Sequence, residues 1–130
     1  MSSTVFGVAY DAADAAVAAR FWAAALGRPV APGADSTHAV VEAADVASSG
    51  PRLAFHKVPE GKTVKNRVHL DLRPVDRTRE QEVERLLALG ATQLADHRRP
   101  DGSGWITLAD PEGNEFCILS RDPAGSGPTT

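Results

Sequence analysis

The feature of this sequence that most limits its fold is an internal repeat of one strand-like run, one helix and further strand-like runs. Two helix-like segments end in related tetrapeptides, AALG at 24–27 and LALG at 87–90. Each is preceded by a short apolar run and followed by β-rich sequence, although the run around 28–31 is weakly marked. Each half is therefore predicted to fold as βαβββ, over about residues 4–58 and 66–121.

The two helices have recognisable start and stop signals. Residues 15–26 read AAVAARFWAAAL, rich in the strongest helix former, and Asp14 is a suitable N-cap. In the second half either Asp76 or Thr78 caps a helix that runs to residue 89, and both helices end at a glycine. We therefore predict an α+β fold in which paired βαβββ modules form a curved mixed sheet around a cleft.

A hairpin is predicted near the end of the chain. Residues 105–120 read WITLADPEGNEFCILS, in which two β-like runs flank a tight polar turn. Pro111 fixes φ near the value that the second position of a type I or II turn needs, and Gly113 tolerates a positive φ.

Length, charge and cysteine content narrow the class of protein. The 130 residues fit a single domain, with 122–130 too polar and Gly/Pro-rich to pack, and thus a flexible tail. The net charge is −3 and the charges are interspersed, so we expect no nucleic-acid partner. One cysteine, no signal-peptide pattern and no bilayer-length apolar run predict a cytoplasmic protein without a membrane partner.

Three motifs in this order carry a family resemblance: FWAAALG after the first strand, RVHLDL at the start of the second half, and DPEGNEFCIL near the end. Together with the two βαβββ halves, they resemble the vicinal oxygen chelate superfamily, and within it the glyoxalase/bleomycin-resistance-like proteins with a glyoxalase-like domain. The resemblance covers roughly residues 4–121. It implies a small-molecule ligand, and dimers are common in that family, so a homodimer is reasonable.

The resemblance also implies where metal ligands would lie. Metal-dependent members take ligands from the first, fourth, fifth and eighth strands, usually His or Glu. The matching positions here are Gly7, His56 (or Phe55 after a one-residue shift), His69 and Cys117. Glycine has no side chain to bind a metal, and a cysteine replaces the usual glutamate. We therefore expect no cofactor; the alternative is a divalent metal, Zn or Fe/Ni, on His56, His69 and Cys117.

Cys117 has two interpretations. Two imidazoles and one thiolate leave an open fourth position, and the softness of sulfur favours zinc. Alternatively Cys117 is a small buried apolar residue, because its neighbours Phe116 and Ile118 would raise the pKa of the thiol and disfavour the thiolate that a metal needs.

His69 is the candidate catalytic residue. In the alternating strand RVHLDLR, His69 and Asp71 share one face, so an imidazole general base with a carboxylate helper is one interpretation. The other is that Asp71 pairs with Arg73 at the surface and has a structural role.

Aromatic residues suggest the walls of a pocket. Trp105 shares strand parity with Thr107, so it can line the cleft and stack on a planar ligand. Phe55 is a second aromatic wall if His56 faces away. The predicted ligand-binding residues are Phe55, His56, His69, Asp71, Trp105 and Cys117.

Three functions are compatible with these residues. The first is a small-molecule-binding protein of the bleomycin-resistance kind, without the usual metal site. The second is a metal-dependent lyase, isomerase or dioxygenase, and the third is a metal-free acid–base enzyme that uses His69. Gly7 and Cys117 favour the first.

Overall fold

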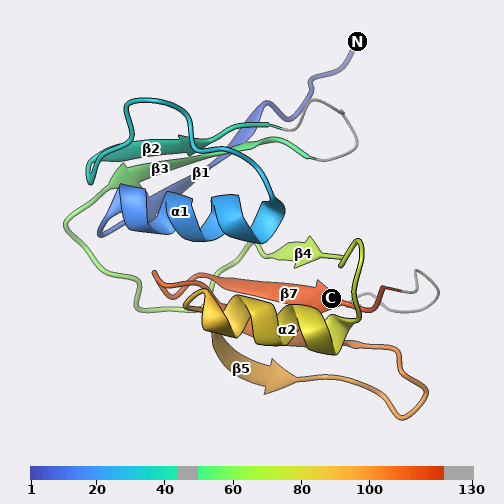
Figure 1. The fold of residues 1–130 in the computed structure, drawn as a ribbon. Helices are drawn as coiled ribbons and strands as arrows, with labels where there is room; N and C mark the ends of the chain where they lie inside the picture. The colour runs from blue at the N-terminus through green and yellow to red at the C-terminus, as the bar shows by residue number, and fades with distance from the viewer. Residues whose placement is uncertain (44–49, 122–130) are drawn as a thin grey trace. The chain divides into compact units, whose positions relative to one another are not determined.

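The polypeptide divides after Gly61 into two units, each built around its own β-sheet (Figure 1). The computed structural model describes residues 1–43 and 50–121. The tail predicted at 122–130 lies outside the described residues. The α+β class is confirmed, and the strands are distributed over a three-stranded and a four-stranded sheet.

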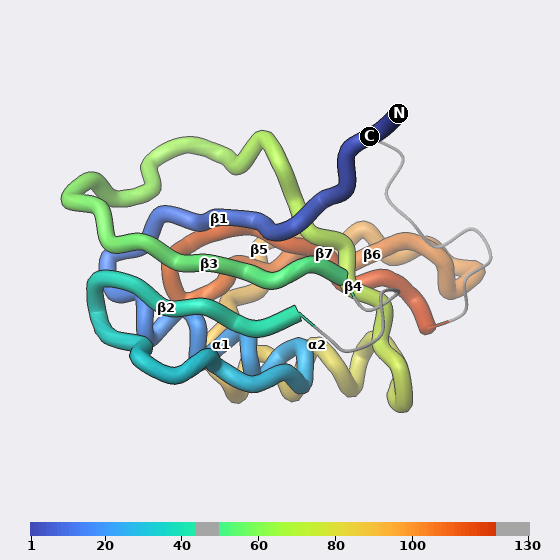
Figure 2. The backbone as a smooth tube through the Cα atoms, turned by 90° about the horizontal axis from the view of Figure 1, so that it is seen from above, coloured from blue at the N-terminus to red at the C-terminus, as the bar shows by residue number. Residues whose placement is uncertain are grey.

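The first unit contains β1 (Gly7–Ala12), α1 (Ala15–Leu26), β2 (His38–Val41) and β3 (Arg52–Lys57). Its strand order is β1-β3-β2, with β1 parallel and β2 antiparallel to β3. Helix α1 runs alongside β2 and β3 (Figure 2).

The weakly marked strand of the first half is reduced to one isolated bridge. Val30 pairs with Val41 in antiparallel orientation, which continues the strand order beyond β2. Pro29 and Pro32 flank this short run, and proline has no N–H to donate to a neighbouring strand. The bridge therefore cannot extend into a full strand.

Aromatic rings fill the core of the first unit. The ring of Tyr10 stacks on Phe55 at a centroid distance of 5.3 Å and on Trp22 at 6.2 Å, while Phe21 meets Trp22 edge-on. The side chains of Trp22 and Phe55 are completely buried. Burial of two large aromatic groups is a main source of stability in a sheet of only three strands.

The second unit is a full βαβββ module. It contains β4 (Leu70–Leu72), α2 (Arg79–Ala88), β5 (Thr92–Asp96), β6 (Trp105–Ala109) and β7 (Glu115–Leu119). The order β4-β7-β6-β5 places β4 parallel to β7, as β1 is to β3 in the first unit. The second half therefore has the predicted βαβββ order, whereas the described part of the first unit has two strands after its helix and the Val30–Val41 bridge.

Both helices begin at side-chain caps. Asp14 accepts a hydrogen bond from the backbone of Val17 at 3.2 Å, as predicted. Of the two candidates for α2, Thr78 is the cap, and its hydroxyl and the side chain of Gln81 bond each other's backbone N–H. In the described residues no helix has both the length and the apolar character needed to cross a bilayer.

The predicted hairpin joins β6 to β7 through a turn that is organised by Asp110. This side chain is 4% exposed, and its Oδ1 accepts from the backbone N–H of Glu112 at 2.9 Å and of Asn114 at 2.8 Å. Gly113 closes the turn with φ +86°, a conformation that L side chains rarely adopt.

The Asp110→Ala substitution should lower the free energy of unfolding by about 1–3 kcal/mol, because two backbone N–H groups lose a buried acceptor. Asp110→Asn keeps an acceptor oxygen and should cost less. Urea unfolding of the three proteins measures the difference; equal midpoints for wild type and D110A would contradict this role.

Candidate functional site

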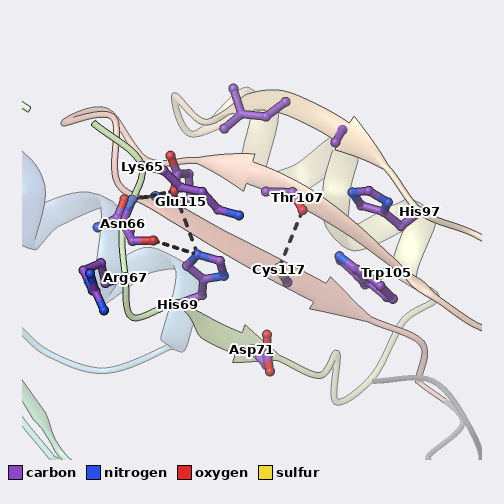
Figure 3. Close-up of a pocket in the computed structure, with 12 residues that line it drawn as sticks. Lys65, Asn66, Arg67, His69, Asp71, His97, Trp105, Thr107, Glu115 and Cys117 are labelled. Atoms are coloured by element: carbon purple, nitrogen blue, oxygen red, sulfur yellow. Dashed lines mark hydrogen bonds and ion pairs between the residues drawn. The ribbon is translucent and has the colours of Figure 1, made fainter. Parts of the chain in front are cut away.

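A pocket of about 790 Å³ lies on one face of the four-stranded sheet (Figure 3). This volume falls within the range of small-molecule sites in proteins. All of its lining residues belong to the second unit: Lys65, Asn66, Arg67, His69, Asp71, Leu94, Ala95, His97, Trp105, Thr107, Glu115 and Cys117.

The side chains of β6 and β7 point alternately to the two faces of the sheet, and those on one face form the pocket floor. Trp105 and Thr107 of β6, and Glu115 and Cys117 of β7, face the pocket. The residues between them are buried on the other face of the sheet, where they form the core: Ile106, Leu108, Phe116 and Ile118. Thr107 is the register partner of Cys117, and its Oγ1 lies 3.6 Å from Sγ.

Asn66 and Glu115 bind each other reciprocally, and we call this pair the Asn66–Glu115 clamp. The backbone N–H of Asn66 donates to Glu115 Oε2 at 2.8 Å, and the backbone N–H of Glu115 donates to Asn66 Oδ1 at 2.9 Å. Asn66 Nδ2 also donates to Asn114 Oδ1 at 3.1 Å. The clamp fixes the segment before β4 to the start of β7.

The charge of Glu115 is compensated within the second unit. Lys62 Nζ lies 3.2 Å from Oε1, and His69 Nε2 lies 4.0 Å from Oε2. Burial acts to raise the pKa of this carboxyl, but the Asn66 N–H, Lys62 and His69 outweigh it and hold the pKa below the ordinary value of about 4.5.

His69 is oriented by the clamp. Its Nε2 lies 3.1 Å from the carbonyl oxygen of Asn66. Because a carbonyl only accepts, Nε2 carries the proton in this hydrogen bond, and a neutral ring then has its lone pair on Nδ1. The sequence suggested Asp71 as the carboxylate helper, whereas the carboxylate that the structure places beside Nε2 is Glu115.

Asp71 is placed beside the thiol of Cys117, its register partner on β7. Cys117 is 3% exposed, and burial is the main cause that raises the pKa of its thiol; Asp71 raises it further, against an opposing hydrogen bond from Thr107. Arg73, the alternative partner of Asp71, donates from Nη1 to the Ser120 carbonyl at 2.5 Å.

The remaining predicted residues lie in the first unit. Phe55 is wholly enclosed in the aromatic core, where its ring stacks on Tyr10, and it does not line this pocket. His56 is exposed, and its ring lies 4.9 Å from that of His38. At Gly7 a Cβ would come within 2.9 Å of Arg52 Cγ.

The donors of this pocket do not fit a divalent metal. A thiol whose pKa is raised by burial resists the ionisation that coordination needs, and the Nε2 of His69 already donates to Asn66. Within the described part of each unit, His, Cys, Asp and Glu side chains form no group of three that could hold a metal ion.

One end of the pocket is aromatic. The rings of Trp105 and His97 stack at a centroid distance of 4.8 Å and an interplanar angle of 26°. The guanidinium of Arg99 lies 5.6 Å from the centroid of the Trp105 ring. Trp105 thus lines the pocket, and so does His97, which is not among the predicted ligand-binding residues.

Sequence reasoning missed eight of the twelve residues that line the pocket. Strand parity could have found Glu115, because it shares a face with Cys117. The loop residues Lys65, Asn66 and Arg67 carry no periodic signal, and only the clamp brings them to the pocket. Leu94 and Ala95 line it together because β5 has a register shift between Gln93 and Ala95.

The sequence profile of the glyoxalase-like domain family matches residues 7–119. The chain belongs to this family. The resemblance seen in the motifs is therefore confirmed, and with it membership of the vicinal oxygen chelate superfamily. No protein among those with curated functions matches this glyoxalase-like chain.

Solved structures agree with the fold of the glyoxalase-like chain. The oxidase ChaP-H2 is 25% identical, with a TM-score of 0.62 and coverage of 98% of this chain and 100% of the other. A glyoxalase/bleomycin resistance protein/dioxygenase family enzyme from Burkholderia phytofirmans PsJN is 18% identical, with a TM-score of 0.66 and coverage of 89% and 97%.

A third similar structure holds a metal. It is a mutant of the fosfomycin resistance protein FosX from Listeria monocytogenes, complexed with Mn(II) and 1S,2S-dihydroxypropylphosphonic acid. It is 16% identical, with a TM-score of 0.68 and coverage of 95% of this chain and 94% of the other. At identities of 16–18%, the structural similarity shows a shared fold alone.

Because the pKa of Glu115 is lowered in the folded state, its contribution to stability is present above the ordinary carboxyl pKa and is lost as the pH falls through the lowered value. We expect Glu115→Gln to remove this part of the acid dependence. Urea unfolding between neutral and acidic pH measures it, with E84Q on the exposed face of α2 as a matched control. If the free energy of unfolding falls with pH equally in wild type and E115Q, the stabilising role of the Glu115 carboxylate is contradicted.

Proposed function

We propose that this chain is a small-molecule-binding protein of the glyoxalase/bleomycin-resistance kind, and that its ligand occupies the pocket of the second unit without a metal. The observation that carries the proposal is the combination of a pocket of about 790 Å³ with a floor of Thr107 and a neutral thiol, Cys117. Such a floor offers weak hydrogen bonds and apolar contact to a ligand.

The family supports small molecules as ligands, since the FosX relative is complexed with a phosphonic acid. Mn(II) is bound by that protein. Here the matching first-strand position is Gly7 and the eighth-strand position is Cys117, so two of the four ligand positions lack a suitable donor. This supports binding by side chains alone.

We also propose that the protein acts in the cytoplasm as a homodimer. Its single cysteine suits a reducing compartment. The edge strands β1, β4 and β5 each have one side without a partner among the described strands of their sheets. Unpaired strand edges favour association with a second chain.

The proposal predicts that EDTA-treated protein is stabilised by some members of a small-molecule library, because a ligand that binds only the folded state raises the melting temperature. Trp105→Ala should remove this stabilisation. The matched control is Gln93→Ala, an exposed change on β5 outside the pocket lining. Zn²⁺, Ni²⁺, Fe²⁺ and Mn²⁺ should leave the melting temperature unchanged.

Two outcomes count against the proposal. One is stoichiometric metal in the purified protein, together with a metal-induced rise in melting temperature that Cys117→Ser abolishes. The other is a library in which every stabilising compound acts equally on wild type and W105A.

A second candidate function is metal-free acid–base catalysis by His69. The observation that favours it is the orientation of the ring, with Nε2 held by the Asn66 carbonyl at 3.1 Å and Glu115 Oε2 at 4.0 Å. In this arrangement Nδ1 would take a proton from the substrate, and the carboxylate would stabilise the resulting imidazolium.

His69→Ala separates this candidate from simple binding. If a bound compound is converted by the wild type, H69A should lower the rate by a factor of about 10²–10⁴, the usual contribution of a general base, while the melting temperature stays near that of wild type. Steady-state rates on the same compound measure it. An unchanged rate would assign His69 to the pocket wall alone.

A further inference from the structure

Two cations in the pocket lining lack an acidic partner. Lys65 and Arg67 flank the clamped Asn66, and both line the pocket (Figure 3). Among the described residues, neither lies within ion-pair distance of a carboxylate, whereas the nearby Lys62 pairs with Glu115. Two positive charges therefore face this end of the pocket, which we call the basic end.

The carboxylates of the lining do not cancel the basic end. Glu115 is already bound by Lys62 and by the backbone of Asn66. Asp71 lies beside Cys117, two residues further along β7 than Glu115, which is about 7 Å along the strand. The basic end is thus free to bind an anionic group.

The aromatic pair Trp105–His97 lies at the opposite end of the pocket (Figure 3). Trp105 is the register partner of Leu119, and Ala109 is that of Glu115, so four residues of strand separate Trp105 from the clamp. At 3.2–3.4 Å per residue this separation is about 13 Å. Lysine and arginine side chains extend several ångströms into this distance. The remaining length between their charged groups and Trp105 matches a molecule of two or more fused rings.

From these positions we infer the class of ligand: an elongated, planar aromatic molecule with a carboxylate or phosphate group at one end. The anionic group binds Lys65 and Arg67, and the rings pack on Trp105 and His97. Charge-assisted hydrogen bonds would recognise the anionic group, and aromatic contact would recognise the rings. This inference rests on the proposed binding function and specifies its ligand.

The test compares matched probes by isothermal titration calorimetry on EDTA-treated, full-length protein. 2-Naphthoate and 2-naphthyl phosphate carry rings and an anion, 2-naphthamide carries the rings alone, and cyclohexanecarboxylate carries the anion alone. We expect at least one naphthyl anion to bind about tenfold or more tighter than 2-naphthamide, because charged hydrogen bonds are stronger than neutral ones. Cyclohexanecarboxylate should bind more weakly than either anion.

Variants assign the two ends. The double variant K65Q/R67Q should bind the naphthyl anions and 2-naphthamide with equal affinity, whereas R20Q/K57Q removes two exposed cations of the first unit and should keep the preference. Trp105→Ala should weaken all three naphthyl probes. Circular dichroism and the unfolding midpoint confirm that each variant is folded.

The outcomes separate the two proposals. If 2-naphthamide binds as tightly as the naphthyl anions and W105A weakens both, the anionic class is overturned while small-molecule binding in the pocket stands. If no naphthyl probe binds, or if K65Q/R67Q keeps the full preference, the ligand class is also overturned. Whether the pocket binds small molecules at all is tested separately, by the library experiment on the wild type and W105A.

Discussion

The reciprocal hydrogen bonds between Asn66 and Glu115 are the interaction on which the pocket depends. Each residue satisfies the other's backbone N–H, at 2.8 and 2.9 Å, so the loop before β4 is held to the start of β7. The same carboxylate binds Lys62, and the Asn66 carbonyl orients His69. Asn66 thus holds the Glu115 carboxylate, orients the His69 ring and fixes the loop before β4.

The chain retains the family fold while its residues depart from the family's metal-binding pattern. Gly7 has no donor atom, and burial keeps Cys117 as a thiol. Thr107 and the Cys117 thiol form the centre of the pocket floor. The lining also holds Asp71 and Glu115, and Glu115 is paired with Lys62, whereas Lys65 and Arg67 have no carboxylate within ion-pair distance among the described residues. That distribution favours recognition of an anionic organic ligand by side chains.

Sequence periodicity predicted most of the fold because it depends on local rules. The helix caps, the turn at Asp110 and the shared face of Trp105 and Thr107 follow from capping, turn chemistry and strand parity. Strand parity could not predict the placement of Phe55 in the core, because Leu53, Ala54 and Phe55 are buried one after another and show no alternation. The clamp joins residues 49 apart in sequence, and no local pattern encodes it.

We propose above all that the pocket of the second unit binds a small molecule without a metal. Two-dimensional ¹H–¹⁵N NMR of EDTA-treated protein, titrated with a library compound that raises the melting temperature of the wild type, tests it directly. The two tryptophans give one indole signal each. We expect the signals of the Trp105 indole and of the Asn66 and Glu115 amides to shift, while the signal of the buried Trp22 indole stays in place. Shifts confined to the first unit, or seen only after a metal is added, would contradict it.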